Sequence, residues 1–349
     1  MRFLPGIGLG AVLTMALLEA MLRLMPVNSG VSMEDSSPAK PFAHYLAAQS
    51  YMVSDGWALE NARRGTINDQ GFANSRDYRG TGGTLVIGDS YIQSFMLDYG
   101  DTVQGRLDTM LSGNVHAAAA SGNGLADSLR IAQFYLPRLR PRTVVFFVEP
   151  FDLSGLLDAP VRGHNGFSVS EGTPAVVHNA YRESPLKRLI QKSALLRYAY
   201  YNLKIADWLS RAASSGPAAR DSMGAASVVA KEQVLRYYFS QIQAVASTEP
   251  SRVLFLMDGD RRAIHASKPP RPAPAWNDEE RRLFLRLASM HGFEVIDMQP
   301  VFVRHWVRYK ERMDFLPADG HWNRVAHKLA AEEVFKRLQA GEAARQASP

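Results

Sequence analysis

Short apolar runs alternate with longer amphipathic stretches along most of the chain. The apolar runs predict buried strands at 84–87, 115–120, 143–148, 252–257 and 293–296, and the clearest of them, 143–148 (TVVFFV), is β-branched and aromatic throughout. Helical spacing predicts helices at 101–111, 125–139, 184–211, 231–247, 277–290 and 322–338. Strands that alternate with helices favour a parallel sheet covered on both faces, with functional sites at the carboxyl ends of the strands. Residues 23–80 and 150–183 lack this pattern and are expected to be irregular.

The first apolar run differs from the others because it is apolar on every side. Residues 3–22 (FLPGIGLGAVLTMALLEAML) contain one charge, Glu19, and a helix of this length spans about 30 Å, close to a bilayer core. No small-residue cleavage pattern follows, which favours an uncleaved membrane anchor over a removed signal peptide. A buried core helix is the alternative, but core helices seldom stay apolar on all faces.

Composition excludes several classes of protein. The chain has 349 residues, a formal net charge of +6 and no cysteine, so disulfides, thiolate metal sites and cysteine nucleophiles are excluded. The basic residues are scattered, so nucleic-acid binding is not expected. We expect no cofactor, and no closely spaced histidine pair indicates a metal. The length predicts an anchor (1–25), a lead-in (26–80), one catalytic domain (81–340) and a flexible tail (341–349).

The first candidate for chemistry is Gly88-Asp89-Ser90, which directly follows the predicted strand 84–87. A serine there lies exposed on a strand-to-helix turn at the carboxyl edge of the sheet, where a nucleophile needs to be. Turn formation alone is the alternative, because all three residue types favour turns.

The second candidate is Asp319-Gly320-His321. A serine hydroxyl needs a base, and the base needs a carboxylate that orients it. Residues two apart in an extended loop project to the same side, so Asp319 can hold His321 while the other ring nitrogen faces Ser90. Helix capping by Asp319 or Asn323 is the alternative. His291, His305 and His327 are competing bases.

The third candidate is the glycine-rich turn Ser121-Gly122-Asn123-Gly124, after the second predicted strand. Glycine lets the backbone approach a substrate, and its N–H can stabilise a developing oxyanion. An ordinary strand-to-helix turn is the alternative.

Taken together, these residues resemble the SGNH/GDSL hydrolase family. Gly88-Asp89-Ser90 looks like the first sequence block of the family, Ser121-Gly122 like the second, and Asp319-Gly320-His321 like the last. The D-x-H spacing, followed by Trp322, resembles the branch that handles O-acetyl groups on bacterial exopolysaccharides. The segment 67–72 (INDQGF) is similar to one that often precedes the GDS strand in membrane-anchored members.

The resemblance implies a three-layer α/β/α, flavodoxin-like fold with a central parallel sheet and an N-terminal transmembrane helix. It implies Ser90 as nucleophile, His321 as general base and Asp319 as its orienting acid. Gly122 is then an oxyanion donor, through its backbone N–H. The other candidates for the oxyanion or substrate-binding site are Asp89, Tyr91, Asn123 and Trp322.

One position departs from the family pattern. The third block is usually G-x-N-D, whose asparagine donates to the oxyanion, whereas this chain has Glu149-Pro150-Phe151-Asp152. Phenylalanine cannot donate a hydrogen bond. The oxyanion site therefore uses another donor, such as Asn123, or the chain has reduced activity.

The resulting hypothesis is a serine esterase or O-acetyltransferase that forms an acyl-serine intermediate on O-acetyl esters of a cell-envelope glycan or exopolysaccharide. The alternatives are a glycan-binding or assembly protein with weak catalysis, and a general carboxylesterase or lipase. The expected partners are an acylated polysaccharide, the bacterial inner membrane through residues 3–22, and other exopolysaccharide-assembly proteins. The catalytic domain is expected in the periplasm.

Overall fold

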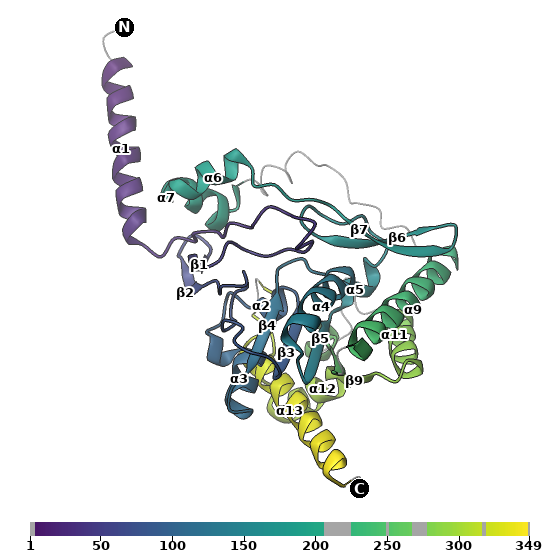
Figure 1. Ribbon diagram of the computed structural model, residues 1–349. Coiled ribbons are helices and arrows are strands. Elements are labelled where there is room, and N and C mark those ends of the chain that lie inside the picture. Colours follow the sequence, from purple (N-terminus) through teal and green to yellow (C-terminus); the bar gives the residue numbers. More distant parts are fainter. Residues whose placement is uncertain (1–3, 206–224, 249–250, 267–277, 316–318, 348–349) are drawn as a thin grey trace.

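A five-stranded parallel sheet forms the centre of the molecule (Figure 1). The structure is a computed structural model that describes residues 4–205, 225–248, 251–266, 278–315 and 319–347. The strands are β3 (Thr84–Gly88), β4 (Val115–Ala119), β5 (Thr143–Val148), β8 (Arg252–Met257) and β9 (Glu294–Asp297). Their order, β4-β3-β5-β8-β9, is the flavodoxin-like order, with its switch point beside the first strand. The predicted central parallel sheet is confirmed.

Side chains of the sheet alternate between two cores. Leu85 and Ile87 pack into one core, whereas Val86 between them packs into the other, as the two-residue period of a strand requires. The helices of the first core are α4 (Leu125–Leu139), α9 (Ala225–Thr248) and α11 (Asp278–Met290). The second core is covered by α2 (Ser90–Gln93), α3 (Val103–Met110), α12 (Met298–Tyr309) and α13 (Arg324–Ala347).

The structure differs from the predicted helices in three places. The segment around His305 was assigned no element but forms α12, which begins at the Asp297 cap, where the side chain accepts a hydrogen bond from Gln299 N–H. Helix α13 continues to Ala347 through the predicted tail, whose alanine, glutamate and arginine residues are good helix formers. The predicted helix 184–211 is divided into three short elements, which are α6 (Pro185–Lys192), α7 (Ala194–Arg197) and η2 (Tyr198–Asn202). Residues 206–211 lie outside the described residues.

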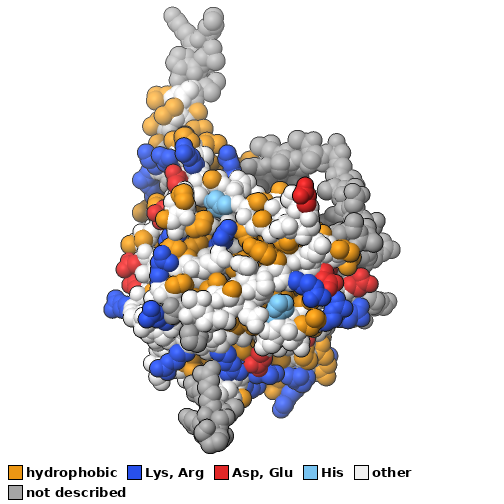
Figure 2. All heavy atoms as spheres, turned by 45° about the vertical axis from the view of Figure 1, so that its right-hand side comes forward, with side chains coloured by type: hydrophobic (Ala, Val, Ile, Leu, Met, Phe, Trp, Pro, Cys, Tyr) orange, Lys and Arg blue, Asp and Glu red, His pale blue; other side chains and the backbone are white. Residues whose placement is uncertain are grey.

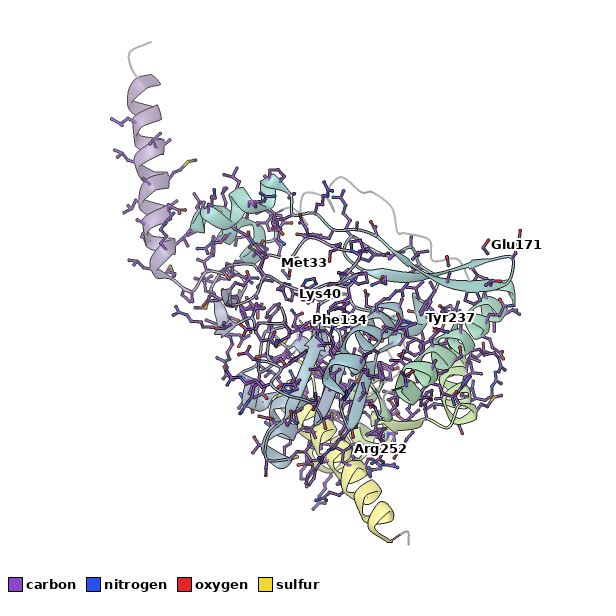
Figure 3. The ribbon with its side chains drawn as sticks, in the orientation of Figure 1. Met33, Lys40, Phe134, Glu171, Tyr237 and Arg252 are labelled. Atoms are coloured by element: carbon purple, nitrogen blue, oxygen red, sulfur yellow. The ribbon has the colours of Figure 1, made fainter. Side chains whose placement is uncertain are left out.

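Both segments that were expected to be irregular contain a β-hairpin. The lead-in forms β1 (Ser50–Asp55) and β2 (Glu60–Thr66), and residues 150–183 form α5 (Pro150–Ser154), β6 (Asn165–Ser170) and β7 (Thr173–His178). The second hairpin packs on α4 and α9. In Figure 3, Glu171 marks its turn and Tyr237 marks α9 beneath it, while Lys40 and Phe134 mark the lead-in and α4. The remaining elements are η1 (Tyr99–Asp101) and α10 (Arg261–His265).

The apolar N-terminal run forms helix α1 (Leu4–Leu24), which stands away from the body of the molecule (Figure 1). Figure 2 shows apolar side chains along its described part, and Leu9 and Val12 are more than 60% exposed. At its base, the Glu19 carboxylate accepts hydrogen bonds from Ala194 N–H and Leu195 N–H, which begin α7. Within the described part of the chain, no helix combines the length and hydropathy that a membrane crossing requires, so the predicted transmembrane helix is unsupported.

Phe255 is a test of the larger core because its ring lies among four others. It is fully buried on β8, with ring centroids 5.3–5.5 Å from those of Phe146, Phe239, Phe284 and Phe293. We expect Phe255→Ala to lower the free energy of unfolding by about 3–5 kcal/mol, measured by urea denaturation. Val307→Ala, at an exposed position of α12, is the control and should change the free energy of unfolding by less than about 0.5 kcal/mol. A change at Phe255 as small as the control would contradict this packing.

Candidate active site

Ser90 lies at the carboxyl end of β3, in the first turn of α2. The turn is tight: a Cβ on Gly88 would lie 2.5 Å from Ile92 Cγ1, so only glycine fits there. The next residue, Asp89, caps the helix by accepting a hydrogen bond from Tyr91 N–H at 2.8 Å. The sequence Gly-Asp-Ser therefore serves the turn and exposes the serine at the same time.

The structure brings Ser90, His321 and Asp319 together as a hydrogen-bonded chain. His321 Nε2 lies 2.8 Å from Ser90 Oγ, and His321 Nδ1 is hydrogen-bonded to Asp319 Oδ1. The same Asp319 oxygen accepts the His321 backbone N–H at 2.9 Å. Burial raises the pKa of Asp319, but the hydrogen bonds from His321 outweigh it, so the pKa lies below its usual value. A carboxylate only accepts, so Nδ1 carries the proton and the Nε2 lone pair faces the serine hydroxyl.

An ion pair that sequence reasoning missed holds the loop with His321 in place. Asp258 follows β8, and both of its oxygens accept from Arg261 Nη1, at 2.6 and 2.7 Å. Arg261 Nη2 donates to the carbonyl of Gly320 at 2.7 Å, between Asp319 and His321. Because Arg261 and Asp258 are both buried, this contact fixes the position of His321 relative to the sheet. The sequence signal, Asp-Gly-Asp-Arg after a strand, is too short to recognise by itself.

The two aromatic candidates support His321 and do not form an open binding surface. Trp322 is fully buried, and its Nε1–H donates to Asp258 Oδ1 at 2.7 Å. The prediction that it binds substrate is wrong for this structure, because a buried ring cannot stack on a sugar. The Tyr91 ring packs 4.7 Å from the His321 ring, and its hydroxyl accepts from Arg261 Nη2 at 3.1 Å.

The predicted oxyanion residues lie beside Ser90, but their side chains are used differently. Gly122 has a φ of +86°, which glycine adopts without strain. Asn123 Nδ2 donates to the Gly88 carbonyl at 3.0 Å, so the side chain braces the turn beneath Ser90. Phe151 occupies the start of α5 with its ring 52% exposed. No side chain among these three is placed as a free donor, which leaves the backbone N–H groups for this role.

A cavity of about 330 Å³ opens directly beside Ser90. Gly122 and Phe151 line it, and His164 and Asn165, just before and at the start of β6, also line it. The segment 150–183 therefore forms a wall of the site. A larger cavity of about 710 Å³ lies elsewhere, beside the start of β4, and does not include any of the three hydrogen-bonded residues.

Three carboxyl groups meet beneath the serine. Burial and the neighbouring Asp89 raise the pKa of Glu149 to about 10, and the two side chains are hydrogen-bonded. Burial likewise raises the pKa of Asp89 to about 6, and burial followed by Asp89 raises that of Asp152. Glu149 is therefore protonated at neutral pH and donates to Asp89. This pair could not be predicted from the sequence, because Asp89 and Glu149 follow two different strands, β3 and β5.

The competing histidines lie away from Ser90 Oγ. His327 is buried behind the site, where its Nδ1 accepts from Val103 N–H at 3.0 Å and its Nε2 lies 2.9 Å from Ser94 Oγ. Burial lowers the pKa of His327 to about 3, so it stays neutral. His291 contacts Gln243, and His305 lies 3.2 Å from Glu311.

Comparison with known proteins finds similarity in fold only. No family model and no curated protein matches the chain. Similar solved structures include an acetyl xylan esterase, AlAXEase (13% identity, TM-score 0.42, 73% of this chain and 98% of that chain). Others are a lipase/acylhydrolase from Enterococcus faecalis (16%, 0.39, 74% and 96%) and a candidate SGNH hydrolase from Slackia heliotrinireducens (12%, 0.37, 74% and 98%). Similarity this low carries no argument about activity, which has to come from the site itself.

The Glu149–Asp89 pair makes a prediction about stability. The pKa of Glu149 is raised in the folded protein, so between the unfolded value and about 10 the folded state binds a proton that the unfolded state lacks. The stability that this proton contributes is fully present below the unfolded pKa and is lost as pH rises toward about 10. Between pH 5 and pH 9, the free energy of unfolding of the wild type should therefore fall relative to that of Glu149→Gln. We expect this difference to change by at most about 1.4 kcal/mol per pH unit.

Urea denaturation of both proteins at several pH values measures this difference. Glu279→Gln, the same change at an exposed position in the first turn of α11, is the matched control. A difference between Glu149→Gln and wild type that stays constant with pH would show that Glu149 is ionised in the folded protein.

Proposed function

We propose that this protein is a serine-dependent esterase or acyltransferase that acts on O-acetyl esters of a glycan. The single observation that carries the proposal is the hydrogen-bonded chain from Ser90 Oγ through His321 to Asp319. It lies at the carboxyl edge of a parallel sheet and opens into a cavity large enough for an acetyl group and part of a sugar ring. The resemblance of its three sequence blocks to SGNH/GDSL hydrolases supports the same chemistry.

In this mechanism Ser90 Oγ attacks the ester carbonyl while its proton passes to His321 Nε2. Asp319 supports the imidazolium that forms, and the Asp89 carboxylate adds negative charge nearby. When the carbon–oxygen bond to the leaving alcohol breaks, His321 returns the proton to that oxygen. Water or a second hydroxyl then attacks the acyl-serine, gives its proton to His321, and Ser90 Oγ leaves with that proton.

Backbone N–H groups are the donors that this mechanism needs for the oxyanion. Ser90 and Gly122 are the residues that the resemblance assigns to this role, and both line the cavity. The polar wall from His164 and Asn165 and the exposed Phe151 ring favour a sugar as the alcohol part of the ester, because sugars combine hydroxyl groups with an apolar face.

The same position, Phe151, favours a second candidate function. A non-catalytic glycan-binding protein needs an exposed aromatic ring and does not need the missing third donor. A general carboxylesterase or lipase is the third possibility. The variants below separate these functions.

We expect Ser90→Ala to lower the hydrolysis of p-nitrophenyl acetate by at least about 10³-fold, because the nucleophile is lost. The rate of p-nitrophenol release by the full chain measures this. Ser247→Ala is a matched control, since its exposed hydroxyl donates to the Gln243 carbonyl on α9 and does not line the cavity; it should stay within a few-fold of wild type.

Equal activity of Ser90→Ala and wild type would remove the serine mechanism. No activity in either protein, together with binding of acetylated glycan by both, would favour the glycan-binding function. The products formed from p-nitrophenyl acetate in the presence of a free sugar separate the two reactions. Acetylated sugar would assign acyl transfer, and acetate alone would assign hydrolysis.

The location of the protein is also a proposal. The resemblance to membrane-anchored SGNH/GDSL members and the apolar run of residues 3–22 are its support, and we propose that the catalytic domain lies in the periplasm. Alkaline phosphatase fused to the C-terminus should then be active in cells. An inactive phosphatase fusion, together with activity of a cytoplasmic reporter fused at the same position, would contradict this location.

A further inference from the structure

His164 is a second histidine in the cavity beside Ser90, and the mechanism above does not use it. It precedes β6, lines the cavity together with Gly122, and is only 6% exposed. Its backbone is held on both sides: its N–H donates to the Val161 carbonyl at 3.1 Å, and its carbonyl accepts from Asn179 N–H at 3.0 Å. The side chain is therefore fixed in the wall of the site.

The Asp127 carboxylate fixes the orientation and tautomer of this ring. His164 Nδ1 lies 3.2 Å from Asp127 Oδ2. Asp127 is fully buried at the start of α4, and it also accepts hydrogen bonds from the backbone N–H and side-chain Nδ2 of Asn165, both at 2.8 Å, and from Gly124 N–H at 3.2 Å. A carboxylate that accepts from three other N–H groups acts as an acceptor toward His164 too, so the proton lies on Nδ1.

The other ring nitrogen, Nε2, then presents a lone pair to the cavity. A Cβ placed on Gly122 would lie 3.2 Å from this atom, so Nε2 is the part of the ring nearest the predicted oxyanion residue. Among the described residues, the one hydrogen bond of the His164 ring is made by Nδ1, and Nε2 makes none. An unpaired acceptor that faces a cavity gains a hydrogen bond when the ligand brings a donor.

We propose that His164 Nε2 accepts a hydrogen bond from a hydroxyl group on the alcohol part of the substrate, so that the site selects esters of polyhydroxylated alcohols. This inference rests on the proposed ester chemistry and assigns its substrate class. Ser90 Oγ is already hydrogen-bonded to His321, so His164 acts in binding and not as the base of the reaction. Esters whose alcohol lacks a second hydroxyl leave Nε2 unpaired in the complex, which disfavours them.

Two esters with the same carbon chain test this selection: 2,3-dihydroxypropyl acetate and propyl acetate. The measured quantity is the ratio of their kcat/KM values with the full chain. We expect wild type to prefer the dihydroxy ester, and His164→Asn to lower the ratio by about 10-fold or more, mainly through KM. Asparagine can still donate to Asp127 but does not reach the position of Nε2.

Two further variants make the result specific. His164→Gln reaches farther, and its carbonyl oxygen can accept near the position of Nε2, so it should recover part of the ratio. His178→Asn is the matched control, because His178 lies on the same hairpin, contacts Asn165 at 3.2 Å and does not line the cavity; its ratio should equal that of wild type.

A wild-type ratio near one, or a ratio that His164→Asn leaves unchanged, would overturn the inference. If His164→Asn lowers both kcat/KM values equally, His164 acts on the acyl group or the oxyanion, which also overturns it. Failure of the ester chemistry is recognised separately, because wild type and Ser90→Ala would then release p-nitrophenol at the same rate.

Discussion

The buried ion pair between Asp258 and Arg261 is the interaction on which the geometry of the site depends. His321 lies on a loop, and a loop alone does not hold a base within hydrogen-bonding distance of a serine on a different element. Arg261 holds this loop because it binds Asp258, which follows β8, and the Gly320 carbonyl at the same time. Trp322 donates to the same Asp258 oxygen from the other side of His321. The position of the base is thus fixed by the central sheet.

Protonation of Glu149 reduces the negative charge beneath the site. Asp89, Glu149 and Asp152 converge under the serine, and three ionised carboxylates so close together would repel one another strongly. Protonation of Glu149 leaves Asp89 free to remain a carboxylate and to favour the positive charge that forms on His321 during catalysis. The pair from β3 and β5 therefore links the stability of the turn to the chemistry above it.

Much of the fold could be predicted from the sequence, because parallel strands that are buried on both faces are continuous apolar runs. The strand 143–148 has the predicted bounds, and Ser90, Asp319 and His321 meet because turn and loop residues at the carboxyl edge converge. The β6–β7 hairpin was missed because its alternation is short. Strand β6 buries only Asn165 and Phe167, and the helices that cover them, α4 and α9, are distant in the sequence.

Contacts between distant residues were the part of the site that the sequence could not show. His164 and Asp127 are separated by more than thirty residues, and Asp258 and Trp322 by more than sixty. Each is an ordinary polar or aromatic residue in its own surroundings, and only the folded chain gives it a role. Trp322 shows the opposite error, since its place beside His321 in the sequence suggested substrate binding although its ring is buried.

The most direct test of the central claim is covalent labelling of the nucleophile. The full chain is treated with a fluorophosphonate, which reacts with an activated serine, and the modified peptide is identified by mass spectrometry. The account predicts one adduct, on Ser90, that is lost in His321→Ala and retained in His327→Gln if that variant folds. An adduct on another serine, or none on a folded protein that still hydrolyses p-nitrophenyl acetate, would contradict it.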